Sequence, residues 1–377
     1  MDPLPLLLDL VAANSVNPSL VPGAAGEAAA AEVCRAAMVR AGLDVVVQRV
    51  APGRPNVIGV LDGTMPGPSV LLCGHLDTVG VEGMADPFVP RVENGRVYGR
   101  GAQDMKGGLA AMIAAAGRLA SSWTRGRLIV AAVVDEEHES LGAEALVQGG
   151  WRADAAIITE PTDLALVVAH KGFAWLEVVT RGRGAHGSRP VDGRDAILRM
   201  GRVLSALERL DRDLQARPPV EFQGTGSLHA STIAGGRDWS SYPDRCTLQM
   251  ERRTVGGEDA GMILREAEQI LEALGREDPE FAAAVRLLTC RPPYRLDRDH
   301  PLVTAMGSVL TRAGRSGVPA GLSFWTDAAI LAGAGTPCVL FGPGGAGLHS
   351  LTEYVNVEDV YTCRDILVET VTQLMRQ

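Results

Sequence analysis

Residues 70–78 read Val-Leu-Leu-Cys-Gly-His-Leu-Asp-Thr, an apolar run that predicts a buried strand and ends in a histidine and an aspartate. Side chains alternate along a strand, so His75 and Asp77 lie on the same side of the chain. Ligands of open α/β sheets bind at the carboxyl ends of the strands. An imidazole at this position can bind a metal ion, and a nearby carboxylate can orient its second nitrogen. Taken alone, a His-x-Asp pair more often makes only a local hydrogen bond.

Four further segments place a histidine or a carboxylate where a predicted strand or helix meets a loop. They provide Asp104 at the entry of the apolar helix 108–120, Asp135, Glu136 and Glu137 after the run 128–134, Glu160 after the run 155–159, and His349 after the run 338–341. The ordinary alternatives are a helix cap for Asp104 and a solvated acidic loop after the run 128–134. Together, two histidines and three carboxylates supply the nitrogen and oxygen donors that a binuclear metal site requires.

The order of predicted elements divides the chain into two parts. Strands and helices alternate through residues 1–170 and again from residue 293 onward, which is typical of an α/β domain. Between them, residues 171–292 predict the order βαββαβ, which is typical of a small antiparallel sheet with helices on one face. We therefore expect a discontinuous main domain, residues 1–170 and 293–377, interrupted by an inserted domain at 171–292.

Composition narrows the classes of function that these motifs can serve. The chain carries 36 lysines and arginines against 45 aspartates and glutamates, and the net charge of −9 argues against a nucleic-acid partner. No run approaches the roughly 20 apolar residues of a membrane span, and the N-terminus reads as a helix and not as a signal peptide. Six cysteines without a C-x-x-C pair indicate reduced thiols in a cytoplasmic protein.

Five motifs resemble those of one superfamily of binuclear metallohydrolases, which includes aminoacylase, acetylornithine deacetylase, succinyl-diaminopimelate desuccinylase and glutamate carboxypeptidase. The matching motifs are G-H-L-D-T-V at 74–79, G-R-G-A-Q-D-M-K-G-G at 99–108, D-E-E at 135–137, T-E-P at 159–161 and H-S-L-T-E-Y-V at 349–355. They follow the order of the family through nearly the whole chain. The resemblance implies a zinc-peptidase-like α/β fold, with a central mixed sheet flanked by helices and an inserted lid or dimerisation domain.

The resemblance also implies a set of ligands for two divalent metal ions. One ion would be held by His75, Asp104 and Glu160. The other would be held by Asp104, Glu137 and His349, so that Asp104 bridges the two. Zinc is the expected metal, and cobalt or manganese would suit the same donors. The peptide bond after the bridging aspartate is expected to be cis.

Two more acidic residues have roles in this scheme. Glu136 would be the general base, taking a proton from the water that bridges the metals and later donating it to the leaving amine. Glu137 cannot easily act as both ligand and base, so the adjacent glutamate is the simpler choice for the base. Asp77 would orient His75 from behind the metal.

The inserted domain supplies candidate substrate contacts by the same resemblance. His186 matches a lid histidine that reaches a neighbouring subunit's site and stabilises the oxyanion of the tetrahedral intermediate. Arg253 matches an arginine that binds a substrate carboxylate, whereas Arg252 faces the other way by strand alternation. Ser240 stands where many relatives carry an asparagine, which leaves the substrate open. A homodimer through the lid is expected, and His229 has no assigned role.

The leading hypothesis is metal-dependent hydrolysis of an amide bond in a small N-acyl amino acid. A dipeptidase or a glutamate-type carboxypeptidase would use the same residues, because only the shape of the substrate pocket differs. A non-catalytic relative that binds a small molecule would have lost a ligand or the base, whereas all six positions are present here. His138 and His170 neighbour site residues, but strand alternation points them elsewhere, and we expect both to be structural.

Overall fold

The computed structural model describes residues 1–376, and their backbone forms two compact units. The first unit comprises Met1–Val168, Leu296–Ala320 and the chain from Thr326 onward. The second comprises Ala169–Arg295 and Gly321–Trp325. The first unit is therefore interrupted twice along the sequence.

The short segment Gly321–Trp325 belongs to the second unit, whereas the sequence analysis placed it in the main domain. The backbone N–H of Lys171 donates to the carbonyl of Leu322 at 3.3 Å. The indole N–H of Trp325 donates to the Pro292 carbonyl at 3.1 Å. These contacts connect positions far apart in the chain, which the order of motifs does not reveal.

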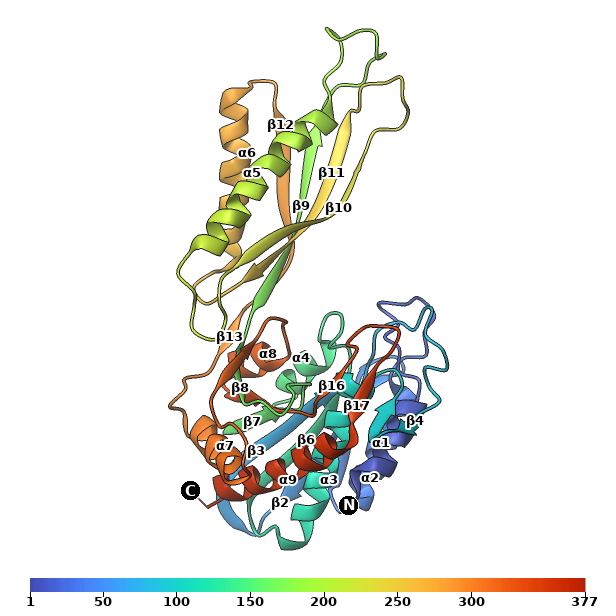
Figure 1. The fold of residues 1–377 in the computed structure, drawn as a ribbon, viewed down its shortest axis with the longest axis vertical. Coiled ribbons are helices and arrows are strands. Elements are labelled where there is room, and N and C mark those ends of the chain that lie inside the picture. The colour runs from blue at the N-terminus through green and yellow to red at the C-terminus, as the bar shows by residue number, and fades with distance from the viewer. Residues whose placement is uncertain (377) are drawn as a thin grey trace. The chain divides into compact units, whose positions relative to one another are not determined.

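A mixed β-sheet forms the centre of the first unit (Figure 1). In sheet order, its strands are β1 (Asp44–Ala51), β2 (Arg54–Asp62), β6 (Arg125–Val133), β3 (Met65–His75), β7 (Ala155–Ile158), β15 (Cys338–Leu340) and β8 (Val167–His170). β3 is parallel to β6 and β7, and β7 is parallel to β15, whereas the outer pairs are antiparallel. The short strands β13 (Tyr294–Arg295) and β14 (Ala320–Leu322) pair with β8. The predicted α/β fold with a central mixed sheet is confirmed.

Helices cover both faces of this sheet. They are α1 (Pro3–Ala12), α2 (Ala28–Arg40), α3 (Gly107–Leu119), α4 (Leu141–Gln148), α7 (Pro301–Arg312), α8 (Ala328–Gly333) and α9 (Val357–Leu374), with short turns at Ala102–Lys106 and Ala120–Ser122. The chain moves from β3 to its neighbour β6 through α3, and then from β6 across to β7 on the other side of β3 through α4. These two crossovers run in opposite directions across the sheet. Right-handed crossovers then place α3 and α4 on opposite faces.

Burial on both faces explains the apolar character of the central elements. The last six residues of β3 and of β6, and all of β7, are buried. Almost every residue of α3 is buried as well, because this helix packs against the sheet on one side and α9 on the other (Figure 1). The apolar helix expected at 108–120 is therefore confirmed.

The parallel strands bring distant parts of the sequence to one edge of the sheet. β3, β6, β7 and β15 all point the same way, so their carboxyl ends lie together. A second, smaller sheet holds β16 (Gly345–Ala346), β17 (Tyr354–Asn356), β5 (Arg96–Tyr98) and β4 (Arg91–Glu93) in this order. It pairs the segment that precedes Asp104 with the segment that follows His349.

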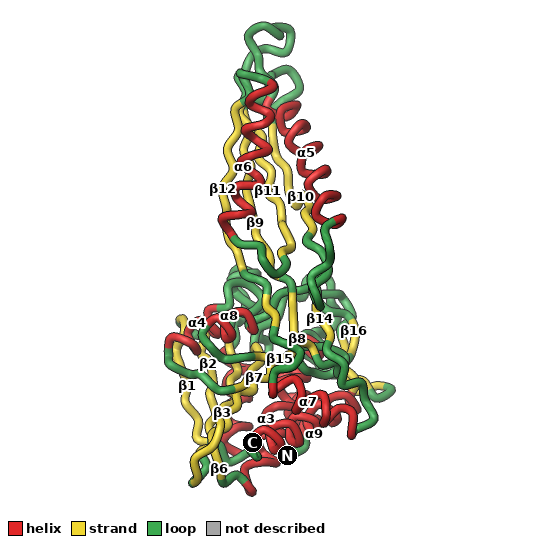
Figure 2. Tube along the Cα trace, turned by 90° about the vertical axis from the view of Figure 1, so that its left-hand side faces the viewer, coloured by secondary structure: helices red, strands yellow, loops and turns green. Residues whose placement is uncertain are grey.

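The second unit contains a four-stranded antiparallel sheet with two helices on one face (Figure 2). Its elements in chain order are β9 (Gly172–Arg181), α5 (Ala196–Ala216), β10 (Ser227–Gly235), β11 (Arg245–Thr254), α6 (Ala260–Glu277) and β12 (Ala282–Arg291). This is the βαββαβ order expected from the sequence. Ala174, Leu176 and Val178 of β9 face the helices and lie in the core of the unit.

Two further properties of the described residues bear on the protein's surroundings. None of the helices among them has both the length and the apolar character that crossing a membrane requires. All six cysteines are free thiols, and five of them are buried.

The buried His170 gives the protein a testable dependence on pH. Burial lowers the pKa of its imidazole to about 4, although Nδ1 donates a hydrogen bond to the Lys171 carbonyl at 2.9 Å. The unfolded chain, with a histidine pKa of about 6.5, binds a proton more readily between these values. This histidine therefore stabilises the fold fully above pH 6.5, and about 3 kcal/mol is lost as the pH falls to 4.

The His170→Asn variant keeps an N–H donor and cannot become charged. We measure the free energy of unfolding with urea at pH 7 and at pH 4.5. Between these pH values, we expect the free energy of unfolding to decrease by less in this variant than in the wild type. The exposed His229 offers a control, since His229→Asn should keep the wild-type difference. Equal pH dependence in His170→Asn and wild type would contradict the prediction.

Candidate metal centre

The predicted metal ligands lie together at the carboxyl edge of the first unit's sheet. The Nε2 atom of His75 lies 3.0 Å from Oδ1 of Asp104, and Nε2 of His349 lies 3.5 Å from Oδ2 of the same carboxylate. His349 Nε2 is also 3.1 Å from Oε2 of Glu137. Asp104 therefore presents one oxygen to each of two imidazoles, as a ligand shared between two ions must.

Two groups of side chains have donor atoms within 4.8 Å of one another. One comprises His75, Glu136 and Glu160, and the other comprises His75, Asp104 and Glu137. The residue expected as the base thus belongs to the same cluster as the expected ligands. These groups do not divide the ligands between two ions in the way the resemblance implies, so the assignment of each ligand to one ion stays a prediction.

The electrostatics of the cluster favour a bound cation. Burial raises the pKa of Glu136, Glu137 and Glu160 above the usual glutamate range, and neighbouring carboxylates add to the rise. Burial would also raise the pKa of Asp104, but hydrogen bonds from His349 and His75 outweigh it and lower that pKa. Four acidic groups face two imidazoles, and a divalent cation would compensate the remaining negative charge. Imidazole nitrogen and carboxylate oxygen are donors that zinc accepts, so the residues fit the metal.

Asp104 is held by the backbone around it and by a buried glutamate. The Asp104–Met105 peptide bond is cis, as the resemblance implied. Both carboxylate oxygens of Glu353 accept backbone N–H groups, from Gly101 on one side and from Gln103 and Asp104 on the other, at 2.9–3.1 Å. Because Glu353 follows His349 by four residues, one carboxylate ties together the two loops that carry these ligands.

Close packing also explains why glycine precedes His75. A Cβ atom on Gly74 would lie 2.7 Å from the methyl carbon of Met105. The same methionine accepts the backbone N–H of His75 at its sulfur, at 3.2 Å. A side chain at position 74 would push the Asp104–Met105 turn away from His75.

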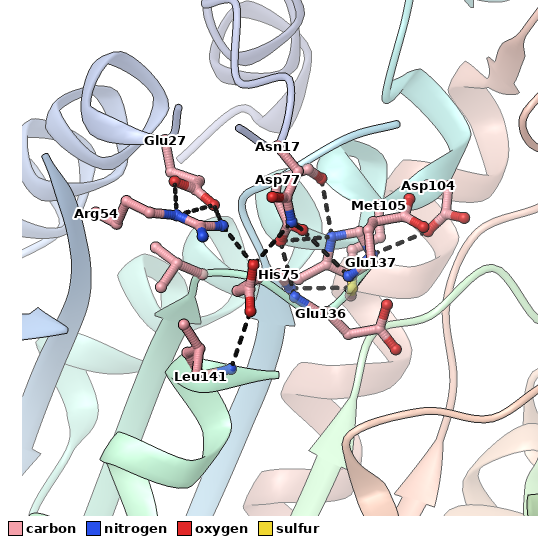
Figure 3. A network of polar contacts seen from close by, with 12 residues as sticks. Asn17, Glu27, Arg54, His75, Asp77, Asp104, Met105, Glu136, Glu137 and Leu141 are labelled. Carbon is pink, nitrogen blue, oxygen red and sulfur yellow. Dashed lines mark hydrogen bonds and ion pairs between the residues drawn. The ribbon is translucent and has the colours of Figure 1, made fainter. Parts of the chain in front are cut away.

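Asp77 contacts its neighbours differently from the expected way (Figure 3). Its backbone carbonyl lies 3.0 Å from Nδ1 of His75, whereas its carboxylate is 3.7 Å from that nitrogen. The carboxylate instead accepts the backbone N–H groups of Glu136 and Glu137, each at 3.1 Å. Asp77 therefore orients His75 through the main chain and holds the turn that carries the expected base through its side chain.

Several buried polar residues beside the cluster escaped the sequence analysis. They are Asn17, Glu27, Arg54, Arg100, Asp327 and Glu353. Asp327 is close enough for its charge to raise the pKa of Glu136 and Glu160. None of the six directly follows a strand that the sequence marks as buried, so the strand-end criterion could not find them. Arg100 and Glu353 lay inside quoted motifs but had no assigned role.

The expected lid residues all belong to the second unit. His186 is exposed, its Nδ1 lies 2.7 Å from Ser188 Oγ, and it pairs with Ser241 in an isolated β-bridge. The Gly187 N–H donates to the carbonyl of Ser240 at 2.6 Å. His186 and Ser240 are therefore neighbours, in the loops beyond one end of β9 and β11.

Arg253 lies near the opposite end of β11. Its Nε donates to Glu251 at 2.7 Å, and its guanidinium lies 5.7 Å from the centre of the Phe173 ring. The preceding Arg252 is buried among the helices, where it pairs with Glu258 and Glu266. β11 has 10 residues and so spans roughly 30 Å. Within this unit, Arg253 is not brought close to His186.

The sequence of the chain is similar to those of known proteins. The sequence profile of Peptidase family M20/M25/M40 matches residues 71–373. Acetylornithine deacetylase of Myxococcus xanthus is 32% identical over 327 residues, which cover 84% of this chain and 83% of that protein. N-formyl-4-amino-5-aminomethyl-2-methylpyrimidine deformylase of Bacillus subtilis is 30% identical over 354 residues, covering 85% and 83% of the two chains.

Solved structures share the fold at lower sequence identity. A tripeptidase of Staphylococcus aureus superposes with a TM-score of 0.82 at 20% identity, covering 100% of this chain and 98% of that one. A dinuclear metal-binding peptidase of the M20 family from Bacillus subtilis gives a TM-score of 0.77 at 16% identity, covering 99% and 98%. With a family profile that spans most of its length, this chain belongs to Peptidase family M20/M25/M40 and is a hydrolase of that family.

Proposed function

We propose that this hydrolase uses two divalent metal ions, most simply zinc, to cleave the amide bond of a small N-acyl amino acid. The observation that carries the proposal is the placement of Asp104 between His75 and His349, with the buried Glu160 and the half-buried Glu136 and Glu137 around it. Relatives at 30% identity or more are named as acetylornithine deacetylases and a deformylase, which supports acyl removal over peptide cleavage. The free cysteines fit a reducing compartment, and we include a cytoplasmic location in the proposal.

The chain's own residues supply the proton transfers. When bound, divalent ions polarise an amide carbonyl and make water more acidic. Glu136 lies with His75 and Glu160 in one donor group, so its carboxylate can accept a proton from water there and return it to the leaving nitrogen. Burial raises the pKa of the Glu136 carboxyl in the metal-free site.

For the lid, we propose that Arg253 binds the substrate carboxylate and that His186 acts on a partner subunit's site in a homodimer. Glu251 occupies only Nε of Arg253, and the two terminal nitrogens suit a carboxylate in paired hydrogen bonds. Because β11 spans roughly 30 Å, a small substrate cannot touch Arg253 and His186 of the same lid. This separation supports a partner subunit as the source of His186 and of its neighbour Ser240.

A substrate panel with purified, zinc-loaded enzyme tests the proposal. We expect kcat/KM for the best N-acetyl, N-formyl or N-succinyl amino acid to exceed that for any dipeptide by at least about tenfold, equivalent to about 1.4 kcal/mol. The same compounds without the α-carboxylate serve as matched controls and should react poorly. Dipeptides that react faster than every N-acyl amino acid would replace the deacylase assignment with a dipeptidase. No turnover of any compound would refute the proposed function.

A further inference from the structure

Behind the turn that carries Glu136 and Glu137 lies a group of buried polar residues that no step of the proposed reaction uses. We call it the rear cluster, and it consists of Asn17, Glu27, Arg54, Asp77 and Asp135. Its members come from four separate parts of the first unit and are joined by an almost continuous set of hydrogen bonds (Figure 3). All five are buried, and Arg54 is the single cation among them.

Asp135 connects this cluster directly to the turn. It has a φ of +71°, a left-handed conformation that a residue with a side chain rarely adopts. Its Oδ1 accepts a hydrogen bond from Nη2 of Arg54 at 2.6 Å, and its Oδ2 accepts the backbone N–H of Glu139 at 3.2 Å. Its backbone carbonyl accepts the N–H of Ser140 at 2.6 Å. The side-chain contacts therefore hold Asp135 in a conformation that reverses the chain and directs the next two side chains.

Arg54 is itself fixed from the other side. Its Nε donates to Oε2 of Glu27 at 2.8 Å, and its Nη2 donates to Oε1 of the same carboxylate at 2.5 Å. Its Nη1 donates to the hydroxyl of Ser19 at 3.0 Å. A guanidinium held in this two-point contact has little freedom to follow Asp135, so it acts as a fixed anchor.

Asn17 joins the two carboxylates that control the turn. Its single side-chain nitrogen donates to Oδ2 of Asp77 at 2.8 Å and to Oδ1 of Asp135 at 3.0 Å. Asp77 in turn accepts the backbone N–H groups of Glu136 and Glu137. The turn is thus held through its backbone by Asp77 and through its first side chain by Asp135, and Asn17 locks these two supports to each other.

We infer that Arg54 and Asn17 are positioning residues that set the orientation of Glu136 and Glu137, although neither contacts any of the expected ligands. The inference rests on the proposed function in naming Glu136 as the base and Glu137 as a ligand. Support of this kind, one contact behind the reacting groups, typically changes metal affinity or activity by about 10- to 100-fold. It predicts that the two residues act together, because both work through Asp135.

The test compares Asn17→Ala, Arg54→Met and the double variant in the full-length protein. We expect kcat to fall by about 10- to 100-fold in each single variant, with KM changed by less than about threefold. The double variant should lose less than the product of the two single losses, since each disrupts the same support. Arg54→Lys keeps the charge without the two-point contact and should restore part of the loss.

Two readouts separate positioning from general loss of stability, and they do not depend on turnover. Without metal, the Asn17→Ala and Arg54→Met variants should show faster amide hydrogen exchange than the wild type in the peptide that contains Glu136 and Glu137. Exchange in α7 should stay as in the wild type. The visible absorption spectrum of the cobalt-loaded enzyme should also change, because it reports the geometry of the ligands. Val309→Ala is the matched control: it creates a cavity in α7 and lowers stability, yet should change neither hydrogen exchange in the peptide that contains Glu136 and Glu137 nor the cobalt spectrum.

Each outcome decides the inference. Faster local exchange, an altered cobalt spectrum and non-additive losses of kcat support it. Asn17→Ala with wild-type kcat, exchange and spectrum overturns it, and this variant carries the test alone if Arg54→Met does not fold. Multiplicative losses in the double variant would also overturn it. If the wild type hydrolyses no N-acyl amino acid, the proposed function fails, whereas hydrogen exchange and the cobalt spectrum still decide the inference.

Discussion

We expect Glu136→Gln to reduce turnover by about 10²- to 10⁴-fold, the range of general acid–base catalysis, while the zinc content stays near two ions per chain. Glutamine has nearly the same shape as glutamate but cannot accept a proton, and general acid–base catalysis contributes effects of about this size. The expectation depends on Glu136 lying in the donor cluster without being one of the five expected ligands. Steady-state kinetics and elemental analysis of the same preparation provide the measurement.

A neighbouring glutamate provides the control for this experiment. Glu139 is three residues further along the same loop and is exposed, so Glu139→Gln should retain wild-type turnover and zinc content. Substantial activity in Glu136→Gln would exclude Glu136 as the base. A loss of zinc in that variant would instead identify Glu136 as a ligand. Its donor atoms lie in one group with those of His75 and Glu160, so zinc content must be measured together with turnover.

We expect Asp104→Asn to lower the zinc content below two ions per chain and turnover by more than about 100-fold, which exceeds the range for residues that only support a ligand. The carboxylate of Asp104 presents one oxygen to His75 and the other to His349, so both of the proposed ions would depend on it. Asparagine keeps one oxygen but loses the negative charge, and its amide nitrogen carries no lone pair available to a metal. Elemental analysis after dialysis, followed by kinetics with added zinc, measures both effects.

The control for Asp104→Asn is an aspartate on the surface of the same unit. Asp62 is exposed and pairs with Arg127, a kind of contact that contributes at most about 1 kcal/mol to stability, so Asp62→Asn should bind two ions and turn over normally. Two ions and wild-type turnover in Asp104→Asn would disprove the bridging role. Two ions with low turnover would show that Asp104 acts in the reaction and is dispensable for binding.

Much of the fold could be predicted because local sequence patterns indicate where its strands and helices lie. The runs at 70–73 and 128–134 have no polar residue, which in a parallel sheet means cover on both faces, and both became buried strands. The order βαββαβ in the inserted domain followed from alternation in strands and amphipathic spacing in helices. Site candidates at strand ends were recognisable because parallel strands deliver their carboxyl ends to one edge.

The remaining parts of the site depend on contacts between distant residues. Glu353 holds the Asp104 turn from 249 positions away, and Arg54 contacts Asp135 from 81 positions away. Arg54 has no local pattern that distinguishes it from an ordinary surface charge, and Glu353 lies in a quoted motif that assigns it no role. The Asp77 side chain was also expected to orient His75, but its carboxylate accepts N–H groups of the next loop and its carbonyl contacts His75 instead.

By itself, therefore, the sequence determined the class of fold and the order of elements in the inserted segment, and it indicated which histidines and carboxylates are candidates for binding metal. These properties depend on side-chain type and on spacing along a single strand or helix, where the geometry is known in advance. The tertiary structure alone decided that Asp104 lies between two imidazoles, that Gly321–Trp325 joins the second unit and that Asn17 and Arg54 support the Glu136 turn. The physical reason is that buried charges and N–H groups must find partners, and only the folded chain determines which distant group becomes the partner.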